Sequence, residues 1–438
     1  MKVLVIGSGG REHALAWALS KSDSKPQIYC APGNAGIAQI AECVSIQATD
    51  VGPLVRFAEE KKIDLTVVGP ESSLAVGIVD EFKKRRILIM GASLAAARLE
   101  ASKAFAKDFM ARHSIPTARY KVASSADEAV QILKSGEFGN ENASVVVKAD
   151  GLAAGKGVVV AGNRAEAIAA IEEMMIGGSV GKEAAERVVL EEALVGREAS
   201  QILFADGKDF VLMPAARDHK RVGEGDTGPN TGGMGVVTDS NVLDESLREK
   251  IVREIVEPSL EGTIKDGFTF QGIMFIGLML TNDGPKVLEY NVRFGDPEAQ
   301  AILVRLQSDM VQSCEAVARG TLDKTKVEFS NNASACVVLA ARGYPAKPET
   351  GHIITGLEEA AQHEDVQVFH AGTKRGEQGK WLTAGGRVLG VTATGEDLQR
   401  ALSRSYTAVN EISWEGMHYR KDIGTARIKD KDERVIKE

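Results

Sequence analysis

Short apolar runs alternate with amphipathic stretches through the first hundred residues. The apolar runs have the length of strands, and the amphipathic stretches have the spacing of helices. The predicted order is strand 2–7, helix 11–22, strand 27–31, helix 54–62, strand 64–69, helix 77–85 and strand 86–91. Such alternation is typical of right-handed βαβ crossovers. Residues 1–103 are therefore predicted to form a doubly wound α/β domain with a parallel sheet.

The pattern changes after residue 103 and again near residue 328. Residues 104–327 are predicted to form a second domain of the α+β type, and 121–190 a small lobe within it. Residues 328–438 are predicted to form a β-rich domain that ends in a polar tail. A chain of 438 residues is too long for one hydrophobic core, so several domains are expected.

The composition favours a cytoplasmic protein. A net charge of −8 argues against nucleic acid as the main partner. The longest apolar run, 272–280, is far shorter than the roughly 18 residues that a membrane span requires. The cysteines have no metal-ligand spacing, so free thiols in a reducing compartment are expected.

The stretch KVLEYNVRFGDPEAQ, residues 286–300, begins as a strand and ends as a cluster of ionisable groups. Glu289 and Asn291 are two apart, so their side chains point the same way on a strand. A carboxylate and an amide oxygen suit Mg²⁺ that is also bound by nucleotide phosphates. Arg293 continues this face and can neutralise a transferring phosphoryl group. Asp296 follows the strand and can hold a cationic or polar substrate group; surface ion pairs are the alternative interpretation.

The turn GSGGREH at 7–13 follows a strand and opens a helix, so its backbone N–H groups can hold an anion. The dinucleotide fingerprint is not met, because Glu12 replaces the third glycine and the second strand ends without a carboxylate. NAD is therefore disfavoured. A phosphate paired with Arg11 fits, and a tight turn without a ligand is the alternative. The turns at 32–34 and 69–71 end the next strands, where ligands of parallel sheets collect.

Two segments indicate a nucleotide site. The segment KADGLAAGKGVVV at 148–160 lacks the spacing of a Walker A loop. It predicts either a plain hairpin or a flap that lays backbone amides and Lys156 over triphosphate oxygens, with Lys148 facing the same phosphates. The segment LEEALVGREAS at 190–200 is either a solvated strand edge or a hinge whose backbone pairs with adenine while a glutamate accepts from ribose hydroxyls.

A third segment, RDHKRVGEGDTGPNTGGMG at 217–235, has six glycines between residues 223 and 235. A long structureless loop within a compact domain is usually functional, so this loop is expected to close over a ligand. His219 is expected to make a polar contact rather than to bind a metal.

Together and in this order, these motifs resemble the glycinamide ribonucleotide synthetase (phosphoribosylamine–glycine ligase) family of the ATP-grasp superfamily. The resemblance covers essentially the whole chain, and RFGDPE and GDTGPNTGGMG are its most specific motifs. The late segment YRKDIG at 419–424 also looks like this family. The implied fold is an amino-terminal α/β domain, an ATP-grasp core with a small lobe that covers ATP, and a carboxy-terminal β-rich domain.

The resemblance also implies a role for each matching residue. The ribose phosphate of 5-phosphoribosylamine would be held by Gly9, Gly10, Arg11, Asn34 and Glu71. ATP would be bound by Lys103, Lys148, Gly155, Lys156, Gly157, Glu191 and Glu198. Mg²⁺ or Mn²⁺ would be bound by Glu289 and Asn291. Glycine and the developing acyl phosphate would be surrounded by the catalytic residues Asp218, Arg293 and Asp296.

The implied function is ATP-dependent ligation of glycine to 5-phosphoribosylamine through glycyl phosphate, in de novo purine biosynthesis. The substrates are small molecules, and a monomer without nucleic-acid or membrane partners is expected. Another ATP-grasp carboxylate–amine ligase with a different acceptor remains an alternative. A nucleotide-binding protein without catalysis is a second alternative, although the expected metal pair and phosphate lysines are present.

Overall fold

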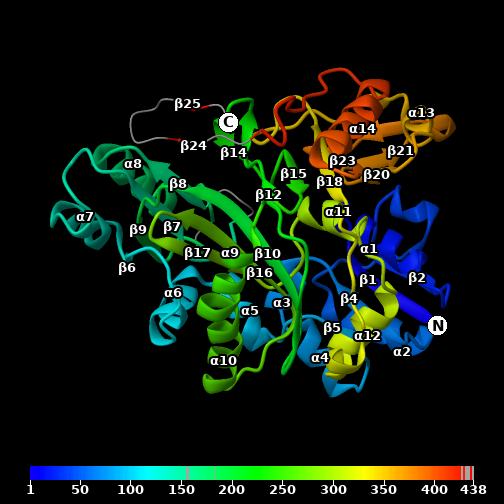
Figure 1. The fold of residues 1–438 in the computed structure, drawn as a ribbon, viewed down its shortest axis with the longest axis horizontal. Helices are drawn as coiled ribbons and strands as arrows, with labels where there is room; N and C mark the ends of the chain where they lie inside the picture. The colour runs from blue at the N-terminus through cyan, green and yellow to red at the C-terminus, as the bar shows by residue number, and fades with distance from the viewer. Residues whose placement is uncertain (154–156, 182, 426–427, 430–434, 437–438) are drawn as a thin grey trace.

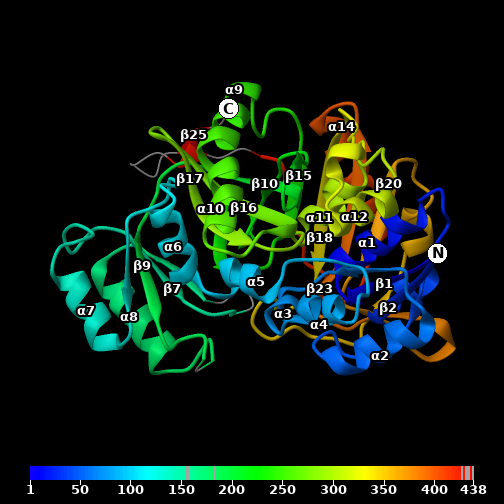
Figure 2. The ribbon, with the colours of Figure 1, turned by 90° about the horizontal axis from the view of Figure 1, so that it is seen from below.

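The computed structural model describes residues 1–153, 157–181, 183–425, 428–429 and 435–436 of the chain. The amino-terminal part (blue) and the carboxy-terminal part (orange) lie on one side of the molecule, and a small lobe lies on the other (Figure 1). A view from below shows the central sheet and its helices between the small lobe and the amino-terminal part (Figure 2).

The amino-terminal part is an open parallel sheet in the order β3-β2-β1-β4-β5. Its strands are β1 (Lys2–Gly7), β2 (Gln27–Pro32), β3 (Glu42–Cys43), β4 (Leu65–Val68) and β5 (Ile89–Met90). Its helices are α1 (Gly10–Ser20), η1 (Ile37–Gln39), α2 (Val51–Lys61), α3 (Glu71–Ala75), α4 (Ile78–Lys84) and α5 (Leu94–Ala101). The predicted parallel α/β architecture is confirmed. The prediction missed β3, because two residues are too few to show a pattern.

The small lobe is an antiparallel sheet in the order β6-β9-β7-β8 with two helices packed on it. The elements are α6 (Lys103–Arg112), which leads into the lobe, β6 (Tyr120–Ala123), α7 (Ala126–Lys134), β7 (Val145–Ala149), β8 (Val158–Ala161), α8 (Arg164–Met175) and β9 (Val188–Glu192). Ser125 and Asn163 cap α7 and α8 by accepting from backbone N–H groups, which fixes where each helix begins.

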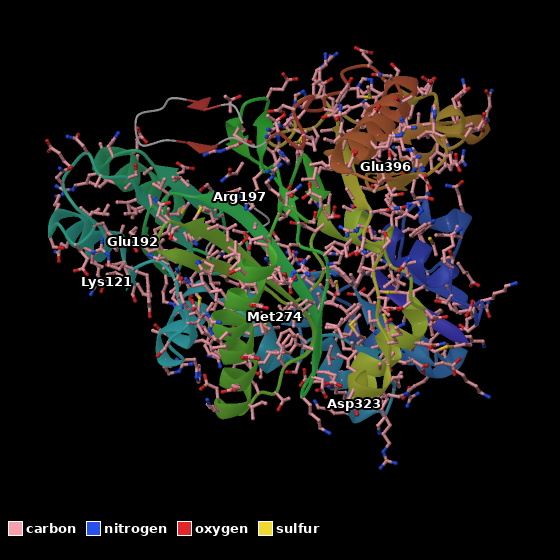
Figure 3. The ribbon with its side chains drawn as sticks, in the orientation of Figure 1. Lys121, Glu192, Arg197, Met274, Asp323 and Glu396 are labelled. Atoms are coloured by element: carbon pink, nitrogen blue, oxygen red, sulfur yellow. The ribbon has the colours of Figure 1, made fainter. Side chains whose placement is uncertain are left out.

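The central sheet is antiparallel, in the order β11-β10-β16-β17. Its elements are β10 (Arg197–Asp206), β11 (Phe210–Leu212), α9 (Glu245–Ile251), the π-helical turn η2 (Val252–Val256), α10 (Glu257–Lys265), β16 (Gln271–Thr281) and β17 (Gly284–Asn291). Its apolar face shares one core with the amino-terminal sheet. Met274 of β16 is fully buried in that core and lies near the middle of the molecule (Figure 3).

The carboxy-terminal sheet has the order β12-β15-β18-β23-β20, and a smaller sheet has the order β19-β22-β21. The larger sheet crosses residue 328, because β12 (Arg217–Asp218) and β15 (Gly235–Thr238) join the later strands. The other elements are α11 (Glu298–Leu303), α12 (Met310–Arg319), η3 (Leu322–Lys324), β18 (Ala333–Ala340), β19 (Ile353–Ile354), α13 (Leu357–Ala360), β20 (Val366–His370), β21 (Thr373–Arg375), η4 (Glu377–Gly379), β22 (Trp381–Thr383), β23 (Arg387–Gly395), α14 (Leu398–Glu411), β24 (Ile428–Lys429) and β25 (Val435–Ile436).

The glycine-rich segment 223–235 is not the structureless loop that its composition predicts. Residues on either side of its first turn pair as β13 (Arg221–Gly223) and β14 (Thr227–Asn230), and β15 begins at Gly235. Hydrogen bonds from the late segment 418–424 satisfy polar groups of this hairpin, which glycine content alone does not reveal.

None of the helices in the described ranges combines the length and the apolar character that a membrane crossing demands.

Glu12 explains the glycines of two amino-terminal turns. Its carboxylate is buried and accepts hydrogen bonds from Gly9 N (2.6 Å) and from Arg11 Nε (2.6 Å). A Cβ at Gly7 would lie 2.5 Å from Glu12 Cγ, and one at Gly69 would overlap with the same side chain. These glycines therefore make room for a buried carboxylate that closes the first turn of α1.

Replacing Gly69 by alanine is expected to lower the free energy of unfolding by about 1–3 kcal/mol, because the new methyl group overpacks against Glu12. Gly52→Ala in α2 is the control, since its Cβ would meet only the flexible Arg56 side chain at 3.7 Å. That change should be neutral or stabilise by up to about 1 kcal/mol. Thermal unfolding of the two variants measures the difference, and equal midpoints would contradict the account of Glu12.

A second prediction concerns acid stability. His13 Nδ1 accepts from His370 N (2.8 Å), a contact that joins α1 to β20, and burial lowers the pKa of His13 to about 4. The unfolded state binds a proton below about pH 6.5 that the folded state does not, so stability falls as pH falls from about 6.5 to about 4. Burial lowers the pKa of His219 to about 4 and that of His370 to about 3, which acts in the same direction.

His13 should account for about 3 kcal/mol of this loss at full extent. His13→Gln keeps an acceptor for His370 N but cannot take up the proton. Its thermal midpoint should therefore drop less between pH 7 and pH 4.5 than that of the natural protein. An identical drop in both proteins would show that His13 is not the group responsible.

Candidate active site

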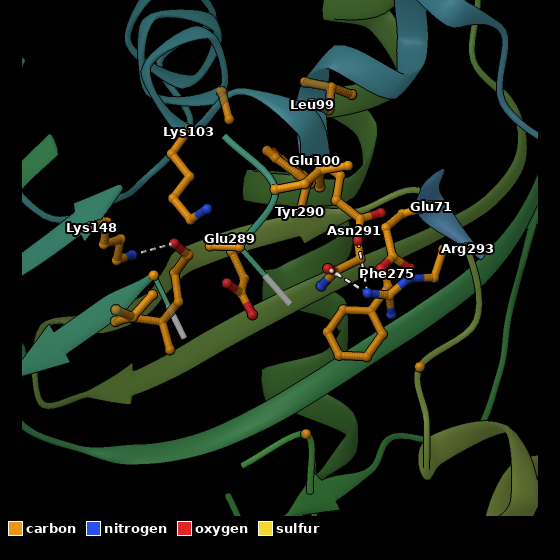
Figure 4. A pocket seen from close by; sticks show the side chains of 18 of the residues that line it. Glu71, Leu99, Glu100, Lys103, Lys148, Phe275, Glu289, Tyr290, Asn291 and Arg293 are labelled. Atoms are coloured by element: carbon orange, nitrogen blue, oxygen red, sulfur yellow. Dashed lines mark hydrogen bonds and ion pairs between the residues drawn. The ribbon is translucent and has the colours of Figure 1, made fainter. Parts of the chain in front are cut away.

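A cavity of about 430 Å³ lies where the small lobe, the central sheet and the amino-terminal part meet. It brings together many of the residues that the sequence predicts to be functional: Arg11, Glu71, Lys103, Lys148, Gly157, Glu191, Asp218, Glu289, Asn291, Arg293 and Asp296. Ionisable residues that the sequence analysis did not select also line it: Glu100, Lys107, Lys220, Glu298 and Arg387. Lys103 and Lys148 lie on one side of Glu289, and Arg293 and Glu71 lie on the other (Figure 4).

Glu289 and Asn291 both line the cavity from the end of β17, as their spacing predicts. Burial by itself raises the pKa of Glu289. Lys220, Lys148 and other nearby cations lower this pKa by more, so it ends below its usual value. The described residues place no lysine or arginine nitrogen within 4.0 Å of its carboxylate. Glu289 is thus an ionised carboxylate that faces the cavity, with no direct ion pair to any residue that the structure describes.

A bulge in β17 shapes the same region. Gly277 pairs with Glu289 and Leu278 pairs with Val287, so Leu288 is an extra residue without a partner on β16. Its carbonyl accepts instead from Lys148 Nζ (3.0 Å), which crosses from β7 of the small lobe. The bulge therefore aims Lys148 at the cavity and links the small lobe to the metal-binding candidates.

The guanidinium of Arg293 is held by acidic groups from the amino-terminal part. Its Nε donates to Glu71 Oε2 (3.0 Å) and its Nη2 lies 2.7 Å from Glu100 Oε1. Nη2 also donates to Asn291 Oδ1 (3.3 Å), and Nη1 donates to the Phe294 carbonyl (3.2 Å). Arg293 is therefore fixed in one orientation, with most of its donors engaged.

Glu100 is the most buried member of this network and was missed from the sequence. Burial raises its pKa, while Arg293 opposes the shift, and its second oxygen accepts from Val292 N (2.8 Å). It lies in an ordinary helical stretch, RLEAS, that belongs to none of the motifs above. Only its tertiary contacts single it out.

Glu191 lies between two lysines of the cavity. Its oxygens are 2.8 Å from Lys107 Nζ and 2.8 Å from Lys148 Nζ, and all three side chains are buried. Burial lowers the pKa of Lys107 to about 8 and, with Lys148 nearby, also lowers that of Lys103. The acid thus compensates a cluster of cations that is suited to polyphosphate oxygens.

A second cluster of carboxylates, formed by Asp218, Asp296 and Glu298, lines the cavity on its carboxy-terminal side. Burial and the neighbouring Glu298 raise the pKa of Asp218. Burial also raises the pKa of Asp296, but Arg387 and Arg11 shift it below its usual value. Arg387 Nη1 donates to the Asp296 carbonyl (2.6 Å), although it comes from β23, far away in sequence.

The remaining predicted residues lie beside the cavity rather than in its wall. Gly9 and Gly10 adjoin Asp296, whose carboxylate accepts weakly from Arg11 N (3.4 Å). The amide of Asn34 is fully used: its nitrogen donates to Ser8 O and His370 O, and its oxygen accepts from two backbone N–H groups. Their part in holding a phosphate remains a prediction, and Asn34 could contribute only through its backbone.

Of the residues predicted to bind ATP, Glu198 is described by the structure, whereas Gly155 and Lys156 are not. Glu198 is half-exposed and pairs with Lys220 (3.0 Å) at the rim of the site. Gly155 and Lys156, predicted for the phosphate flap, lie outside the described residues.

Comparison with known proteins identifies relatives along the whole chain. Models of phosphoribosylglycinamide synthetase match residues 1–100 (N domain), 101–299 (ATP-grasp domain) and 334–426 (C domain). A phosphoribosylamine–glycine ligase from Xylella fastidiosa is 48% identical over 431 residues, which cover 98% of each chain. One from Vibrio cholerae is 47% identical over 435 residues, covering 98% of this chain and 99% of its own.

Solved structures give the same result. The crystal structure of phosphoribosylamine–glycine ligase from Thermotoga maritima has a TM-score of 0.82 and 34% identity, and the match covers 96% of this chain and 100% of that one. The biotin carboxylase domain of the Hydrogenobacter thermophilus 2-oxoglutarate carboxylase shares the fold, with a TM-score of 0.70 and 16% identity over 95% and 91% of the two chains. The resemblance predicted from the motifs is confirmed, and the chain belongs to the phosphoribosylglycinamide synthetase family.

Proposed function

We propose that this protein joins glycine to 5-phosphoribosylamine with cleavage of ATP, giving glycinamide ribonucleotide, ADP and phosphate in de novo purine biosynthesis. The observation that supports this most directly is the cavity itself. It combines Arg11 from the region of the N-domain match, Glu289 and Arg293 from that of the ATP-grasp match, and Arg387 from that of the C-domain match. Full-length relatives named for the same ligation support the choice of substrates.

ATP would lie between the small lobe and the central sheet. Lys103 and Lys148 would face its phosphates, together with the backbone of Gly157 and with Gly155 and Lys156 of the flap. Glu191 would hold Lys107 and Lys148 in place, and its neighbouring backbone would meet the adenine. Glu198, at the rim, is suited to accept from ribose hydroxyls.

Glu289 and Asn291 would hold Mg²⁺ or Mn²⁺. One carboxylate and one amide oxygen are hard ligands that suit these cations. The described residues contain no group of three or more histidine, cysteine or carboxylate side chains arranged for a metal, so phosphate oxygens would have to complete the coordination. When bound, the cation would offset charge on the transferring phosphoryl group.

Arg293 would stabilise the negative charge that develops as the carboxylate of glycine takes the phosphoryl group. Because Glu71 and Glu100 already fix its orientation, little reorganisation accompanies the reaction. Asp218 and Asp296 would face the ammonium group of glycine; with Glu298 nearby, they make this side of the cavity acidic. The amine of 5-phosphoribosylamine would then attack the acyl carbon and release phosphate.

The phosphate of 5-phosphoribosylamine would bind beside the amino terminus of α1. Arg11 supplies the charge, Gly9 and Gly10 supply backbone donors, and Glu71 orients the two arginines that lie beside it. Glu12 already accepts from the backbone N–H of Gly9, and Asp296 accepts from that of Arg11, so the phosphate would have to share the helix end with these two carboxylates.

The proposal also covers the domain boundaries, the cellular compartment, the oligomeric state and the partners of the protein. Residues 1–103 would form the acceptor domain, 104–327 the ATP-grasp domain with its small lobe 121–190, and 328–438 the β-rich domain that completes the cavity. A cytoplasmic monomer that acts on small molecules, with neither nucleic acid nor membrane as a partner, is proposed.

The first test of function is ADP release with each component omitted in turn. Full turnover is expected only when ATP, Mg²⁺, glycine and 5-phosphoribosylamine are all present, because glycyl phosphate must be kept from water. Alanine, which carries one more methyl group, should be a poor substrate in a site fitted to glycine, by about 10-fold or more. Equal turnover with several amino acids would contradict the assignment of glycine.

The second test concerns the metal pair. Glu289→Gln keeps the shape but removes the charge, so turnover should fall by about 10²–10³ while ATP binding weakens only moderately. Mg-ATP should also raise the thermal midpoint of the variant less than that of the natural protein. Asp283→Asn, on the exposed turn between β16 and β17, is the control and should behave as the natural protein does. Near-normal turnover of Glu289→Gln would mean that Glu289 does not bind the metal.

A further inference from the structure

Residues 418–424, here called the carboxy-terminal strap, lie against the hairpin β13–β14 and contain the segment YRKDIG. His418 Nε2 lies 2.9 Å from the Val222 carbonyl, and Asp422 Oδ2 accepts from Gly225 N (2.8 Å). The strap is itself tied to α14, because Tyr406 Oη donates to Arg420 O (2.9 Å) and accepts from Ile423 N (3.1 Å).

Arg420 is the central residue of this contact. Its side chain is 1% exposed, which is rare for a charged group and requires paired partners. Nε and Nη2 donate side by side to the two oxygens of Asp422, each at 2.8 Å. Nη1 reaches across to the hairpin, where it donates to Asp226 Oδ1 (2.7 Å) and to the Arg221 carbonyl (3.1 Å).

The hairpin needs such support because its own pairing is short. The register joins only Arg221 to Asn230 and Gly223 to Thr227, with an irregularity between them. Asp226 has a positive φ of 54°, which costs energy in a residue other than glycine. A two-stranded hairpin of this kind is marginally stable by itself. The strap therefore supports the body of the hairpin, while Tyr344 Oη and Arg387 Nη1 bind the backbone of Gly232 just after it.

Both ends of the hairpin lead into the cavity. Lys220 precedes β13, Thr231 and Gly232 follow β14, and all three line the cavity. The Lys220 carbonyl accepts from Thr231 N and from Thr231 Oγ1, each at 2.8 Å, so the two ends move together. Lys220 Nζ faces acidic groups of the site and pairs with Glu198 (3.0 Å).

The strap also fixes the chain just before the hairpin. Gly424 N donates to His219 Nε2 (3.1 Å), and Arg217 Nη2 donates to Gly424 O (2.7 Å). Asp218, a candidate contact for glycine, lies between these two residues. Residues 217–232 are thus held over the cavity by contacts that come from the far end of the sequence.

We propose that Arg420 and Asp422 are positioning residues that hold the hairpin over the cavity and so keep Lys220, Thr231 and Gly232 against the reacting groups. This inference rests on the proposed ligation through glycyl phosphate. A displaced hairpin would admit water, whose oxygen would add to the acyl carbon of glycyl phosphate and expel phosphate, which regenerates glycine and consumes ATP without product. The strap would thereby couple ATP cleavage to ligation.

Asp226→Asn is the most selective test. Asp226 is partly exposed, and asparagine tolerates a positive φ as well as aspartate does, so the change removes the one carboxylate of the hairpin that pairs with Arg420, keeps the pair with Asp422 and adds no backbone strain. Arg420→Lys is the second variant. Arg404→Lys is the control, because Arg404 pairs with Asp365 (2.8 Å) in the same part of the molecule without contacting the hairpin.

Two measurements distinguish positioning from mere stabilisation. Amide hydrogen exchange of residues 221–232, measured without substrates, should rise by about 10-fold or more in Asp226→Asn and Arg420→Lys and stay unchanged in Arg404→Lys. The ratio of ADP released to glycinamide ribonucleotide formed should be close to one in the natural protein and in Arg404→Lys. It should rise to about two or more in the other two variants.

The results distinguish failure of this inference from failure of the proposed function. If Asp226→Asn and Arg420→Lys keep both the exchange rates and the product ratio of the natural protein, the inference is wrong. Faster exchange with an unchanged ratio would also overturn it, because the hairpin would then have no part in coupling. If Arg420→Lys does not fold, Asp226→Asn alone decides. Failure of the natural protein to release ADP with glycine would instead contradict the proposed function.

Discussion

The rest of the site depends on the pairing of the largely buried Arg293 guanidinium with Glu71 and Glu100. A charge in this position must be paired, and its partners come from two helices of the amino-terminal part: Glu71 at the start of α3 and Glu100 near the end of α5. Removing one partner of a buried pair typically costs about 3–5 kcal/mol, because the other charge is left uncompensated. The pairing therefore fixes the amino-terminal part against the end of β17, where Asn291 and Glu289 enter the cavity.

On both sides of Arg293, most of the other charged groups in the cavity also lie next to a group of opposite charge. Toward the small lobe, Glu191 compensates Lys107 and Lys148, and Glu289 is surrounded by cations but makes no direct ion pair among the described residues. Toward the carboxy-terminal part, Arg387 offsets Asp296. The result is a cavity in which cations and carboxylates alternate, suited to binding a polyphosphate and an amino acid next to each other. Such an arrangement favours catalysis by positioned charge rather than by one reactive side chain.

Features of the fold and the site that depend on neighbouring residues can be predicted from the sequence. Strand and helix alternation sets the parallel sheet, and the two-residue spacing of Glu289 and Asn291 places both on one face of β17. Glu100 and Arg387 could not be found in this way, since only distant contacts bring them to the cavity. The glycines at 7 and 69 look like part of an anion site, yet they make room for Glu12. The segment 223–235 looks like a free loop, because the strap that orders it is about two hundred residues away in the sequence.

The central claim is that the cavity activates the carboxylate of glycine as an acyl phosphate before the amine attacks. The most direct measurement follows oxygen atoms. Glycine labelled with ¹⁸O in both carboxylate oxygens is turned over with ATP, Mg²⁺ and 5-phosphoribosylamine, and the released phosphate is analysed by mass spectrometry. Transfer through glycyl phosphate predicts one ¹⁸O atom in each phosphate, because the bridging oxygen leaves with phosphorus when the amide forms. Phosphate that carries no label, formed while glycinamide ribonucleotide accumulates, would contradict the account.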